Sequence, residues 1–546
     1  MVKYKRGHLY YPEVPIFKIL EDTAKRFPDR YAFLHPKYMK FKDFQEEVDK
    51  FATVLKNLGV KKGDRVALYG PNSIQWEISF FGLEKAGAIL VPMNPQFKET
   101  EVEYELNDSG AETIIVSHAE YPYVAAVKAK TKIKNIIVIE SEDKPVIPNG
   151  TIGWSDIMTK TEPDPPEYDF NVKEDLATLV YTSGTTGLPK GTMLTHYNLV
   201  SNIVQISQTF ELSELDVAII VLPLYHIYGL NVGMNQATLL GFAQVVTPRF
   251  NVKEFCELIE KYRVTHSLCV PPIFLEVVRH LENPNIKGYD WADLKIFNNG
   301  AAPIPLELLE RFDKLAKEKC NAKEVTVQHG WGLTEASPVV AVNPMYRRKM
   351  ESQGTLLSDT FHKIVDLETG KELPERGQVG ELVIKGPQVM KGYWKRHEAT
   401  EEAFWVDPKT GEKWLRTGDM AYIDEEEYEH LLDRIKEMIK YKGWSIAPAE
   451  LEDLLFNNPH IFDAAVIGKP SIELDVGQIP KAFIILKPES KGKVTKKEII
   501  DWVAERISAY KKIREVEFVD DIPKSGSGKI LRRKLVDLEK ERLGIK

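Results

Sequence analysis

The chain has 546 residues, of which 43% are hydrophobic and 28% are charged. This length predicts two to four domains, and the composition is typical of a soluble globular protein. Lys and Arg number 73 and Asp and Glu number 81, which gives a net charge of −8. That balance argues against a general nucleic-acid-binding protein, because such proteins depend on a basic face for their affinity.

The three cysteines, Cys256, Cys269 and Cys320, are too few and too widely spaced for a disulfide framework or a Cys-x-x-Cys zinc site. We expect buried thiols in a reducing compartment. Residues 1–17 lack the continuous apolar segment of a secretory signal, and the last three residues are neither a peroxisomal nor a prenylation signal. We therefore expect a cytoplasmic protein.

The first half of the chain alternates strand-like and helix-like segments. Residues 65–69 are typical of a strand, residues 73–86 of a helix and residues 88–92 of the next strand. The same alternation continues with strand-like segments at 113–116 and 135–140. Strands separated by helices indicate βαβ units. We predict an α/β fold with parallel sheets in a large N-terminal domain.

Residues 217–248 contain no Asp, Glu, Lys or Arg, so the segment is long enough to be mistaken for a membrane span. In a membrane span, the hydrogen-bonding groups of its polar side chains would all need partners within the lipid. These are His226, Asn231, Asn235, Gln236 and Gln244, and Pro223 and several glycines also interrupt the segment. We predict a buried strand, turn and helix that hold an apolar ligand, and no membrane span.

The pattern changes after about residue 350. Residues 380–387 and 420–424 read as short strands joined by turns, which predicts a small β-barrel layer. From residue 433 onward, short strands (464–468, 481–486, 516–519) alternate with helices (448–457, 496–508, 530–543). We predict an N-terminal domain at 1–433, a hinge at 434–436 and a small, mobile α+β C-terminal domain at 437–546.

The strongest motif is YTSGTTGLPKG at 181–191, which follows a strand-like segment. Glycines let successive N–H groups converge on an anion, and hydroxyls and a lysine add donors for phosphate oxygens. It is not a Walker A loop, because Pro189 stands where the second glycine should be and Gly191 replaces the Ser or Thr. A plain glycine-rich turn explains this composition poorly.

Other motifs are weak when taken singly. They are PKSGSGKI at 523–530, QHGWGLTE at 328–335, Thr417-Gly418-Asp419 and Asp433-Arg434-Ile435-Lys436. We interpret 328–335 as a glycine-flanked turn and 417–419 as a tight turn that presents one carboxylate, which could hold a ribose diol. Each of these motifs, taken alone, is explained by a surface salt bridge or an ordinary turn.

Together these motifs resemble the adenylate-forming superfamily, in particular its acyl-CoA synthetase branch of fatty-acid-CoA and 4-coumarate-CoA ligases. The resemblance covers nearly the whole chain, in order. Besides those quoted, the matching segments are LPLYHIYGLN (222–231), NNGAAP (298–303), GELVIKGPQVMKGYW (380–394), WLRTGDMAYID (414–424) and DRIKEMIKYKGWSIAPAELE (433–452). Residues 424–428 lack the glycine that the family usually carries, which leaves their turn geometry open.

In this family a carboxylate attacks the α-phosphate of ATP, pyrophosphate leaves, and a thiol then displaces AMP. The resemblance implies that the pyrophosphate end of ATP is held by Thr182, Ser183, Gly184, Thr185, Thr186, Gly187 and Lys190. It implies that Thr334 contacts the phosphate and that Glu335 holds Mg²⁺. Adenine would be framed by Ala301, Ala302, His329, Gly330 and Trp331, and the ribose would be bound by Asp419 and Arg434.

Lys529 would be the adenylation lysine, whose ammonium offsets the repulsion between the carboxylate and the α-phosphate. The small domain would rotate about Lys436, and the rotation would bring Lys442, Gly443 and Trp444 to the tunnel of coenzyme A. Arg249 matches a contact to a phosphate of coenzyme A. We also count His226 among the catalytic residues, because its segment would lie near the reacting carboxylate.

We expect an AMP-forming ligase that uses ATP, Mg²⁺ and coenzyme A and acts on a fatty acid of medium to long chain. No charged side chain in 217–248 or 338–340 could recognise a second charge on the acid. The alternative acid is an aryl acid, because LPLYHIYGLN resembles coumarate ligases and Tyr228 could stack on a ring. A luciferase-like monooxygenase and a carrier-protein-loading enzyme are weaker alternatives, and the sequence leaves open a homodimer.

Overall fold

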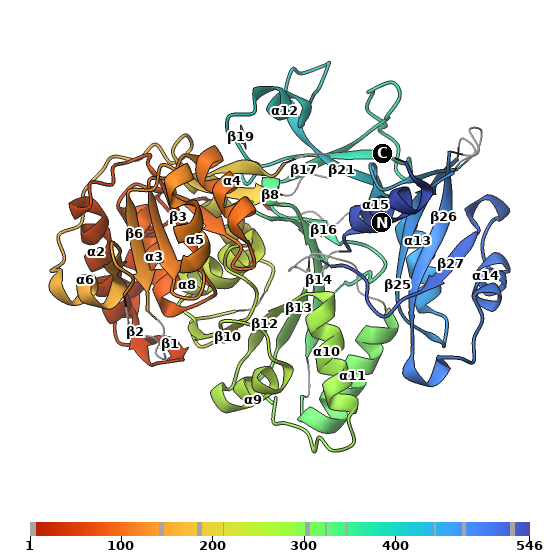
Figure 1. Ribbon diagram of the computed structural model, residues 1–546, viewed down its shortest axis with the longest axis horizontal. Helices are drawn as coiled ribbons and strands as arrows, with labels where there is room; N and C mark the ends of the chain where they lie inside the picture. Colours follow the sequence, from red (N-terminus) through yellow and green to blue (C-terminus); the bar gives the residue numbers. More distant parts are fainter. Residues whose placement is uncertain are drawn as a thin grey trace.

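The computed structural model describes residues 7–140, 147–182, 188–210, 212–300, 306–322, 325–345, 347–441, 444–471, 477–524 and 530–545. An N-terminal sheet unit lies at the left of Figure 1, a second sheet unit lies in the middle, and the C-terminal unit lies at the right. No helix within the described residues is both long enough and apolar enough to cross a membrane.

The first sheet confirms the predicted βαβ alternation. Its order is β19 (Gly392–Tyr393), β9 (Lys190–Thr195), β8 (Leu176–Thr182), β4 (Ile89–Met93), β3 (Arg65–Tyr69), β5 (Thr113–Ser117), β6 (Asn135–Ile139) and β7 (Ile152–Gly153). The six strands from β8 to β7 in this order are parallel to one another. Strand β9 pairs with β8 in antiparallel orientation, and β19 pairs with β9 in antiparallel orientation. The helices up to residue 160 are α1 (Lys18–Arg26), α2 (Phe41–Asn57), α3 (Ile74–Lys85), α4 (Glu99–Ser109), α5 (Tyr121–Val127) and α6 (Trp154–Lys160).

Helix α3 begins where the sequence predicts. The Ser73 hydroxyl accepts a hydrogen bond from the Trp76 N–H at 3.0 Å, which satisfies one of the unpaired donors of the first turn. Nearly all of its side chains are buried, from Ile74 to Glu84. The helix is buried on nearly all sides because it lies in the interior of a large domain, and its buried side chains include the carboxyls of Glu77 and Glu84.

The second sheet has the order β16 (Thr355–Leu356), β15 (Val339–Val342), β14 (Thr326–Gly332), β13 (Ile296–Asn299), β12 (His266–Cys269), β10 (Val217–Ile220), β11 (Ala243–Val246), β1 (Tyr31–His35) and β2 (Met39–Lys40). From β14 to β1 the strands are parallel. Its helices are α7 (His196–Ser207), α8 (Gln236–Leu240), α9 (Val252–Tyr262), α10 (Pro271–Glu282) and α11 (Leu306–Cys320).

The uncharged segment lies inside this second unit, as predicted. It forms β10, a turn, a π-helix at Tyr228–Asn235 that continues into α8, and β11. Every residue of the π-helix is buried. The three cysteines are also buried free thiols, and burial raises the pKa of each.

A third sheet is antiparallel and contains β17 (Phe361–Val365), β18 (Gly380–Lys385), β21 (Lys413–Ile423), β20 (Phe404–Val406) and β22 (Glu429–Arg434), and α12 (His397–Glu402) precedes β20. The interpretation of Thr417–Asp419 as a tight turn is wrong, because these residues lie within β21. Gly418 has a φ of +71°, and the pairing with β18 shifts there, so the feature is a bulge. The turn at 424–428 places Glu427 at a φ of +71° without a glycine.

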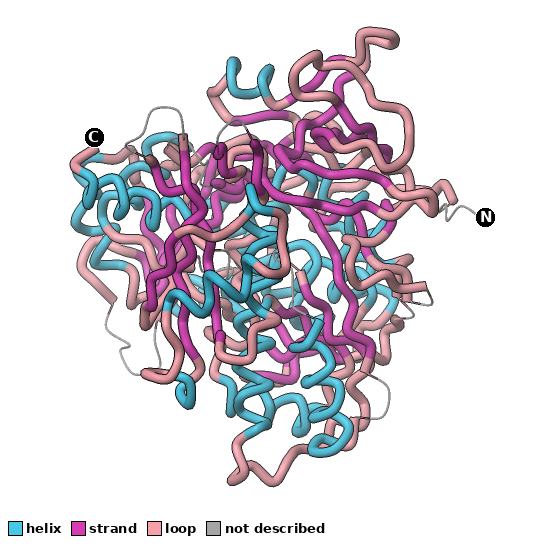
Figure 2. The backbone as a smooth tube through the Cα atoms, turned by 90° about the vertical axis from the view of Figure 1, so that its right-hand side faces the viewer, coloured by secondary structure: helices cyan, strands magenta, loops and turns pink. Residues whose placement is uncertain are grey.

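The C-terminal unit has its own buried apolar cluster, formed by residues between Ile439 and Val516. Its strands are β23 (Ile439–Tyr441), β24 (Trp444–Ile446), β25 (Ile461–Pro470), β26 (Gln478–Leu486) and β27 (Glu515–Phe518), and its helices are α13 (Pro448–Phe456), α14 (Lys496–Ala504) and α15 (Arg532–Leu543). Figure 2 looks onto this unit and shows strands that run side by side with helices around them. Helix α14 ends four residues before the predicted 508, and the domain boundaries themselves stay a prediction.

Candidate active site

The glycine-rich motif spans a β-hairpin. Strand β8 ends at Thr182 and strand β9 begins at Lys190, and these two residues pair directly in antiparallel register. Residues 183–187, which include the predicted phosphate contacts Ser183, Gly184, Thr185, Thr186 and Gly187, lie outside the described residues. The structure therefore describes both ends of the predicted phosphate loop.

Lys190, Tyr393 and Glu335 come together from three separate parts of the chain. The ammonium of Lys190 lies 5.1 Å from the centre of the Tyr393 ring. The Tyr393 hydroxyl donates a hydrogen bond of 2.8 Å to Glu335 Oε1. Glu335 follows Thr334 in a short 3₁₀ turn, Thr334–Ala336, whose backbone is held by a bond from the Met390 N–H to the Glu335 carbonyl. Tyr393 lies in a quoted motif, but the sequence analysis gave it no role.

His329 and Trp331 lie in a strand, which corrects the prediction of a turn at 328–335. Residues 326–332 form β14, and only Thr334 and Glu335 turn away from it. His329 is buried, its Nδ1 lies 3.1 Å from the Asn299 amide nitrogen, and burial lowers its pKa to about 4. Gly330 and Trp331 pair with β15. Ala301 and Ala302 lie outside the described residues.

Asp419 and Arg434 form an ion pair across two strands. They are direct partners in the β21–β22 register, and Arg434 Nε lies 2.7 Å from Asp419 Oδ1. A second guanidinium nitrogen of Arg434 donates to the Thr417 carbonyl at 2.9 Å. Lys436 follows in an exposed turn between β22 and β23.

His226 is held in one tautomer by the backbone. Its Nδ1 accepts a hydrogen bond from the Tyr228 N–H at 3.2 Å, so the proton of the neutral ring lies on Nε2. The side chain is half-buried, and its removal from water lowers its pKa to about 4. His226 is therefore neutral at neutral pH and offers an N–H donor.

Asn72 fixes the segment that leads to His226. Its side chain donates to the Leu222 carbonyl at 2.9 Å and accepts from the Leu224 N–H at 2.8 Å. Asn72 is buried and ends the Gly-Pro-Asn loop after β3, so the first sheet unit positions the second. The sequence shows that loop but not its partner, because the two segments are 150 residues apart.

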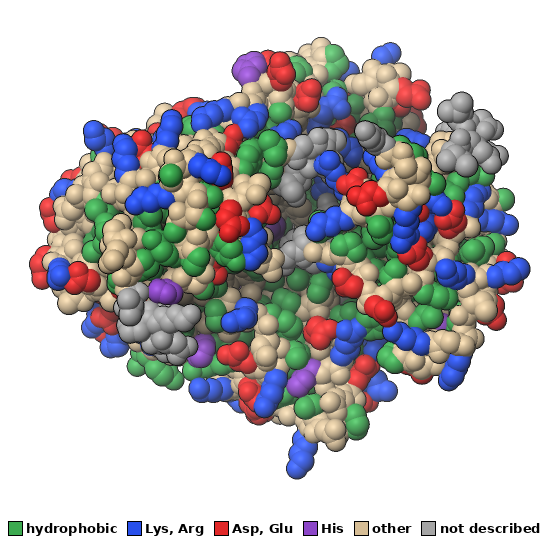
Figure 3. Space-filling view, in the orientation of Figure 1, with side chains coloured by type: hydrophobic (Ala, Val, Ile, Leu, Met, Phe, Trp, Pro, Cys, Tyr) green, Lys and Arg blue, Asp and Glu red, His purple; other side chains and the backbone are tan. Residues whose placement is uncertain are grey.

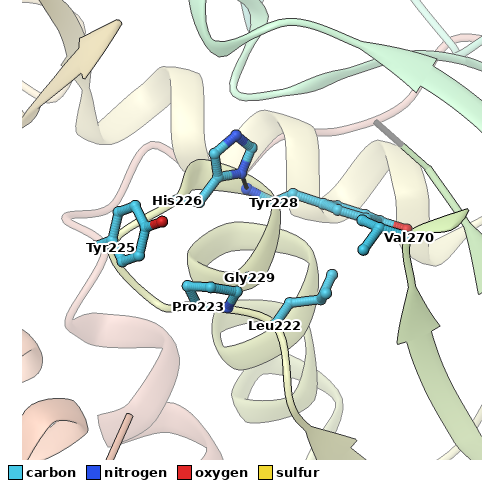
Figure 4. Close-up of a pocket in the computed structure, with 7 residues that line it drawn as sticks. All are labelled: Leu222, Pro223, Tyr225, His226, Tyr228, Gly229 and Val270. Carbon is cyan, nitrogen blue, oxygen red and sulfur yellow. Dashed lines mark hydrogen bonds between the residues drawn. The ribbon is translucent and has the colours of Figure 1, made fainter. Parts of the chain in front are cut away.

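A small cavity of about 10 Å³ lies beside this segment, with Tyr225, His226 and Tyr228 among its lining residues. In Figure 4 the Tyr228 side chain extends toward Val270, and Pro223 and Gly229 close another side. A methyl group on Gly300 would come within 2.9 Å of the Tyr228 ring, so the ring lies directly against the backbone at Gly300. The cavity has room for about one water molecule.

The π-helix beside the cavity is tied to the turn that carries Glu335. The buried Asn231 amide donates to the Ser337 carbonyl at 2.6 Å and to the Leu199 carbonyl at 3.2 Å. Ser337 directly follows the 3₁₀ turn of Thr334 and Glu335. Hydrogen bonds thus connect the π-helix beside the cavity to the turn that carries Glu335.

The remaining predicted residues lie apart from this cluster or cannot be placed. Arg249 is exposed in the loop between β11 and α9. Lys442, Gly443 and Lys529 lie outside the described residues, and of Trp444 only the backbone, in β24, is described. The space-filling view shows a hollow between the N-terminal and C-terminal units (Figure 3), and β8 and β14 run through the same central region (Figure 1).

This arrangement matches a known family. The AMP-binding enzyme family matches residues 20–394, and the AMP-binding enzyme C-terminal domain matches residues 450–529. The chain therefore belongs to the AMP-binding enzymes, which are adenylate-forming. It is 37% identical to a 4-coumarate–CoA ligase of Pinus taeda, over 97% of this chain and 98% of that ligase.

Solved structures agree with this assignment. The crystal structure of a long-chain-fatty-acid-CoA ligase, FadD1 from Archaeoglobus fulgidus, is 37% identical, covers 95% of this chain and 99% of its own, and has a TM-score of 0.74. These findings define the chain as an ATP-dependent, AMP-forming acyl-CoA ligase, that is, an acid–thiol ligase.

A third comparison bears on conformation. MatB from Rhodopseudomonas palustris is 26% identical in two structures. The ATP-bound structure covers 97% of this chain and 100% of its own with a TM-score of 0.84, and the apo structure covers 97% and 99% with a TM-score of 0.75. Because the protein is the same, the difference reflects conformation, and our structure is more similar to the ATP-bound form.

Proposed function

We propose that this ligase activates an aryl acid of the coumarate type, rather than the medium- to long-chain fatty acid that the sequence analysis favoured. The observation that carries this proposal is the similarity to the 4-coumarate–CoA ligase of Pinus taeda, which extends over nearly the full length of both chains. The aryl acid was the alternative in the sequence analysis.

The lining of the cavity supports an aryl acid. Two tyrosines and a histidine face the cavity, and Tyr228 fills the space next to Gly300. Aromatic rings pair favourably in stacked or edge-to-face geometry. Either acid would need this cavity of about 10 Å³ to open, so the support for an aryl acid is the aromatic lining and not the volume.

On the nucleotide side, we propose that Thr182 and Lys190, together with the residues between them, help to hold the pyrophosphate end of ATP, and that Thr334 contacts the phosphate.

The carboxylate of Glu335 is a suitable ligand for Mg²⁺. Among the described residues no group of three or more His, Cys, Asp and Glu side chains could hold a metal ion. Mg²⁺ typically binds one or two carboxylates and completes its shell with phosphate oxygens and water, so a single carboxylate beside a nucleotide suits it.

Further roles follow the family resemblance. We propose that Asp419 and Arg434 bind the ribose, and that Ala301, Ala302, His329, Gly330 and Trp331 frame adenine. Lys529 would bring the carboxylate and the α-phosphate together, and His226 would donate its Nε2–H to the acid carboxylate. Rotation about Lys436 would then bring Lys442, Gly443 and Trp444 to coenzyme A, with Arg249 on a phosphate of coenzyme A.

The test is pyrophosphate release with a panel of acids: 4-coumarate, cinnamate, benzoate, octanoate, decanoate and palmitate. We expect the highest kcat/KM with 4-coumarate or cinnamate. The variant Tyr228→Ala should lose aryl turnover and gain activity with octanoate and decanoate, because it removes the ring and opens space beside Gly300. Strong wild-type turnover of fatty acids with none of cinnamate-type acids would reverse the proposal.

A fatty acid is the second candidate. The observation in its favour is the 37% identity to FadD1, a long-chain-fatty-acid-CoA ligase. It would require the Tyr228 ring to move away from Gly300. Under this candidate, kcat/KM would rise with chain length until the pocket is full. The cytoplasmic location and a homodimer stay predictions.

A further inference from the structure

Asp108 lies in the last turn of α4, and Figure 1 shows α4 near β8 and β19. Its side chain is 10% exposed and contacts two segments that are far away in sequence. One oxygen accepts a hydrogen bond of 2.8 Å from the Tyr181 hydroxyl, and the other accepts one of 2.5 Å from Arg396. The sequence pattern predicts no role for Asp108.

Helix α4 contacts both ends of the glycine-rich motif. Tyr181, which Asp108 holds, directly precedes Thr182 at the end of β8. On the other side, the Tyr104 hydroxyl of the same helix donates to the Pro189 carbonyl at 2.6 Å, directly before Lys190. The two hydroxyl hydrogen bonds therefore fix the strand ends at Thr182 and Lys190, on either side of residues 183–187.

The same helix end also holds the segment after Tyr393. The Asp108 carbonyl accepts a hydrogen bond from the Trp394 indole N–H at 3.2 Å and one from the Lys395 ammonium at 2.6 Å. The Trp394 backbone N–H in turn donates to the Gly191 carbonyl at 2.8 Å. Asp108 thus joins the strand pair β8–β9 to the segment whose Tyr393 contacts both Lys190 and Glu335.

We propose that Asp108 is a positioning residue for the adenylation step: it fixes Lys190 and Tyr393 relative to each other, and through Tyr393 it fixes Glu335. This inference rests on the proposed roles of Lys190 and Glu335 at the phosphates of ATP. Asp108 does not touch the reacting atoms, so its effect is on geometry.

The chemistry of the contacts suits this role. The Asp108 carboxylate hydrogen-bonds to a guanidinium, and charge-assisted bonds of this kind are shorter and stronger than neutral ones. The hydrogen bond that Arg396 donates to Asp108 raises the pKa of Arg396, and burial together with the hydrogen bond to Asp108 raises the pKa of Tyr181, so both groups stay donors. Removal of the carboxylate would take away the acceptor of the half-buried Tyr181 phenol and leave the Arg396 guanidinium with the Lys395 carbonyl.

The experiment compares Asp108→Ala and Tyr181→Phe with the wild type in the two half-reactions. ATP–pyrophosphate exchange, with 4-coumarate or with decanoate if that is the acid turned over, measures adenylation. Thioester formation from coenzyme A and the supplied acyl-AMP measures the second step. We expect the KM for ATP to rise about tenfold in Asp108→Ala and less in Tyr181→Phe, because small displacements of catalytic groups are costly. The KM for the acid and the second step should change by less than about twofold, since neither involves the pyrophosphate.

Glu103→Gln is the matched control, because Glu103 is a carboxylate on the same helix whose partner is the exposed Lys130. The variant Lys190→Ala tests separately whether Lys190 acts at the phosphates of ATP. If Lys190→Ala leaves the KM for ATP unchanged, the proposed role of Lys190 is wrong. If Lys190→Ala raises it but Asp108→Ala and Tyr181→Phe do not, the positioning role is wrong. Equal losses in both half-reactions with a lower melting temperature would show a role in stability alone and would also overturn it.

Discussion

The Tyr393 hydroxyl donates a hydrogen bond of 2.8 Å to Glu335 Oε1, and these two residues are 58 positions apart in the sequence. Burial and the Glu335 carboxylate raise the pKa of Tyr393, so the phenol remains a donor. The bond orients the one carboxylate that we propose for Mg²⁺, as partners of metal ligands commonly do.

The variant Tyr393→Phe should therefore need more Mg²⁺. Loss of an orienting partner typically costs 10-fold or more in metal affinity, so we expect the Mg²⁺ concentration for half-maximal pyrophosphate release to rise about tenfold. A titration of Mg²⁺ at saturating ATP measures this. A variant with an unchanged Mg²⁺ curve but a lower maximal rate would argue that Tyr393 only packs against Lys190.

Lys529→Ala should abolish acyl-adenylate formation and spare thioester formation from supplied acyl-AMP. The ammonium is needed only where two anions meet, which is the first step. Lys534→Ala is the control, because Lys534 is an exposed lysine in α15 that lies five residues after Lys529 in the sequence. Near-normal adenylation in Lys529→Ala would remove Lys529 from the mechanism.

The pH dependence should not show a titration of His226 near the ordinary histidine value of 6.5. Burial lowers its pKa to about 4, so the ring stays neutral until the pH falls toward that value. The same shift makes His226 contribute stability above pH 6.5, which is lost as the pH falls toward 4, because the unfolded chain binds the proton first. A limb of kcat/KM near pH 6.5 that disappears in His226→Gln would contradict this.

The strands and helices of the N-terminal half were predictable, because their signals are local. The segment 65–69 is β3, and Ser73 caps α3 as its position before an apolar helix predicts. The position of the glycine-rich motif after a strand was also predictable. The sequence could not show that Lys190 lies in a second strand that pairs back onto β8.

The wrong prediction at Thr417–Asp419 and the missing roles of Asp108 and Tyr393 share a physical cause. Thr417–Asp419 contains a Thr-Gly-Asp signal of a turn, but Gly418 at a φ of +71° makes a bulge when strands lie on either side of it. Asp108 and Tyr393 carried no local signal, because their partners Arg396 and Glu335 are 288 and 58 residues away. Contacts of this kind depend on the folded sheet and not on the local pattern.

One competition experiment tests both that the ligase forms AMP and that it prefers an aryl acid. Wild-type enzyme receives ATP, Mg²⁺, coenzyme A and equal concentrations of 4-coumarate and decanoate, and mass spectrometry measures both thioesters at low conversion together with AMP. The ratio of the two products equals the ratio of the two kcat/KM values. We expect AMP as the nucleotide product, and we expect 4-coumaroyl-CoA in excess over decanoyl-CoA by about tenfold or more. Decanoyl-CoA in excess would contradict the preference for an aryl acid.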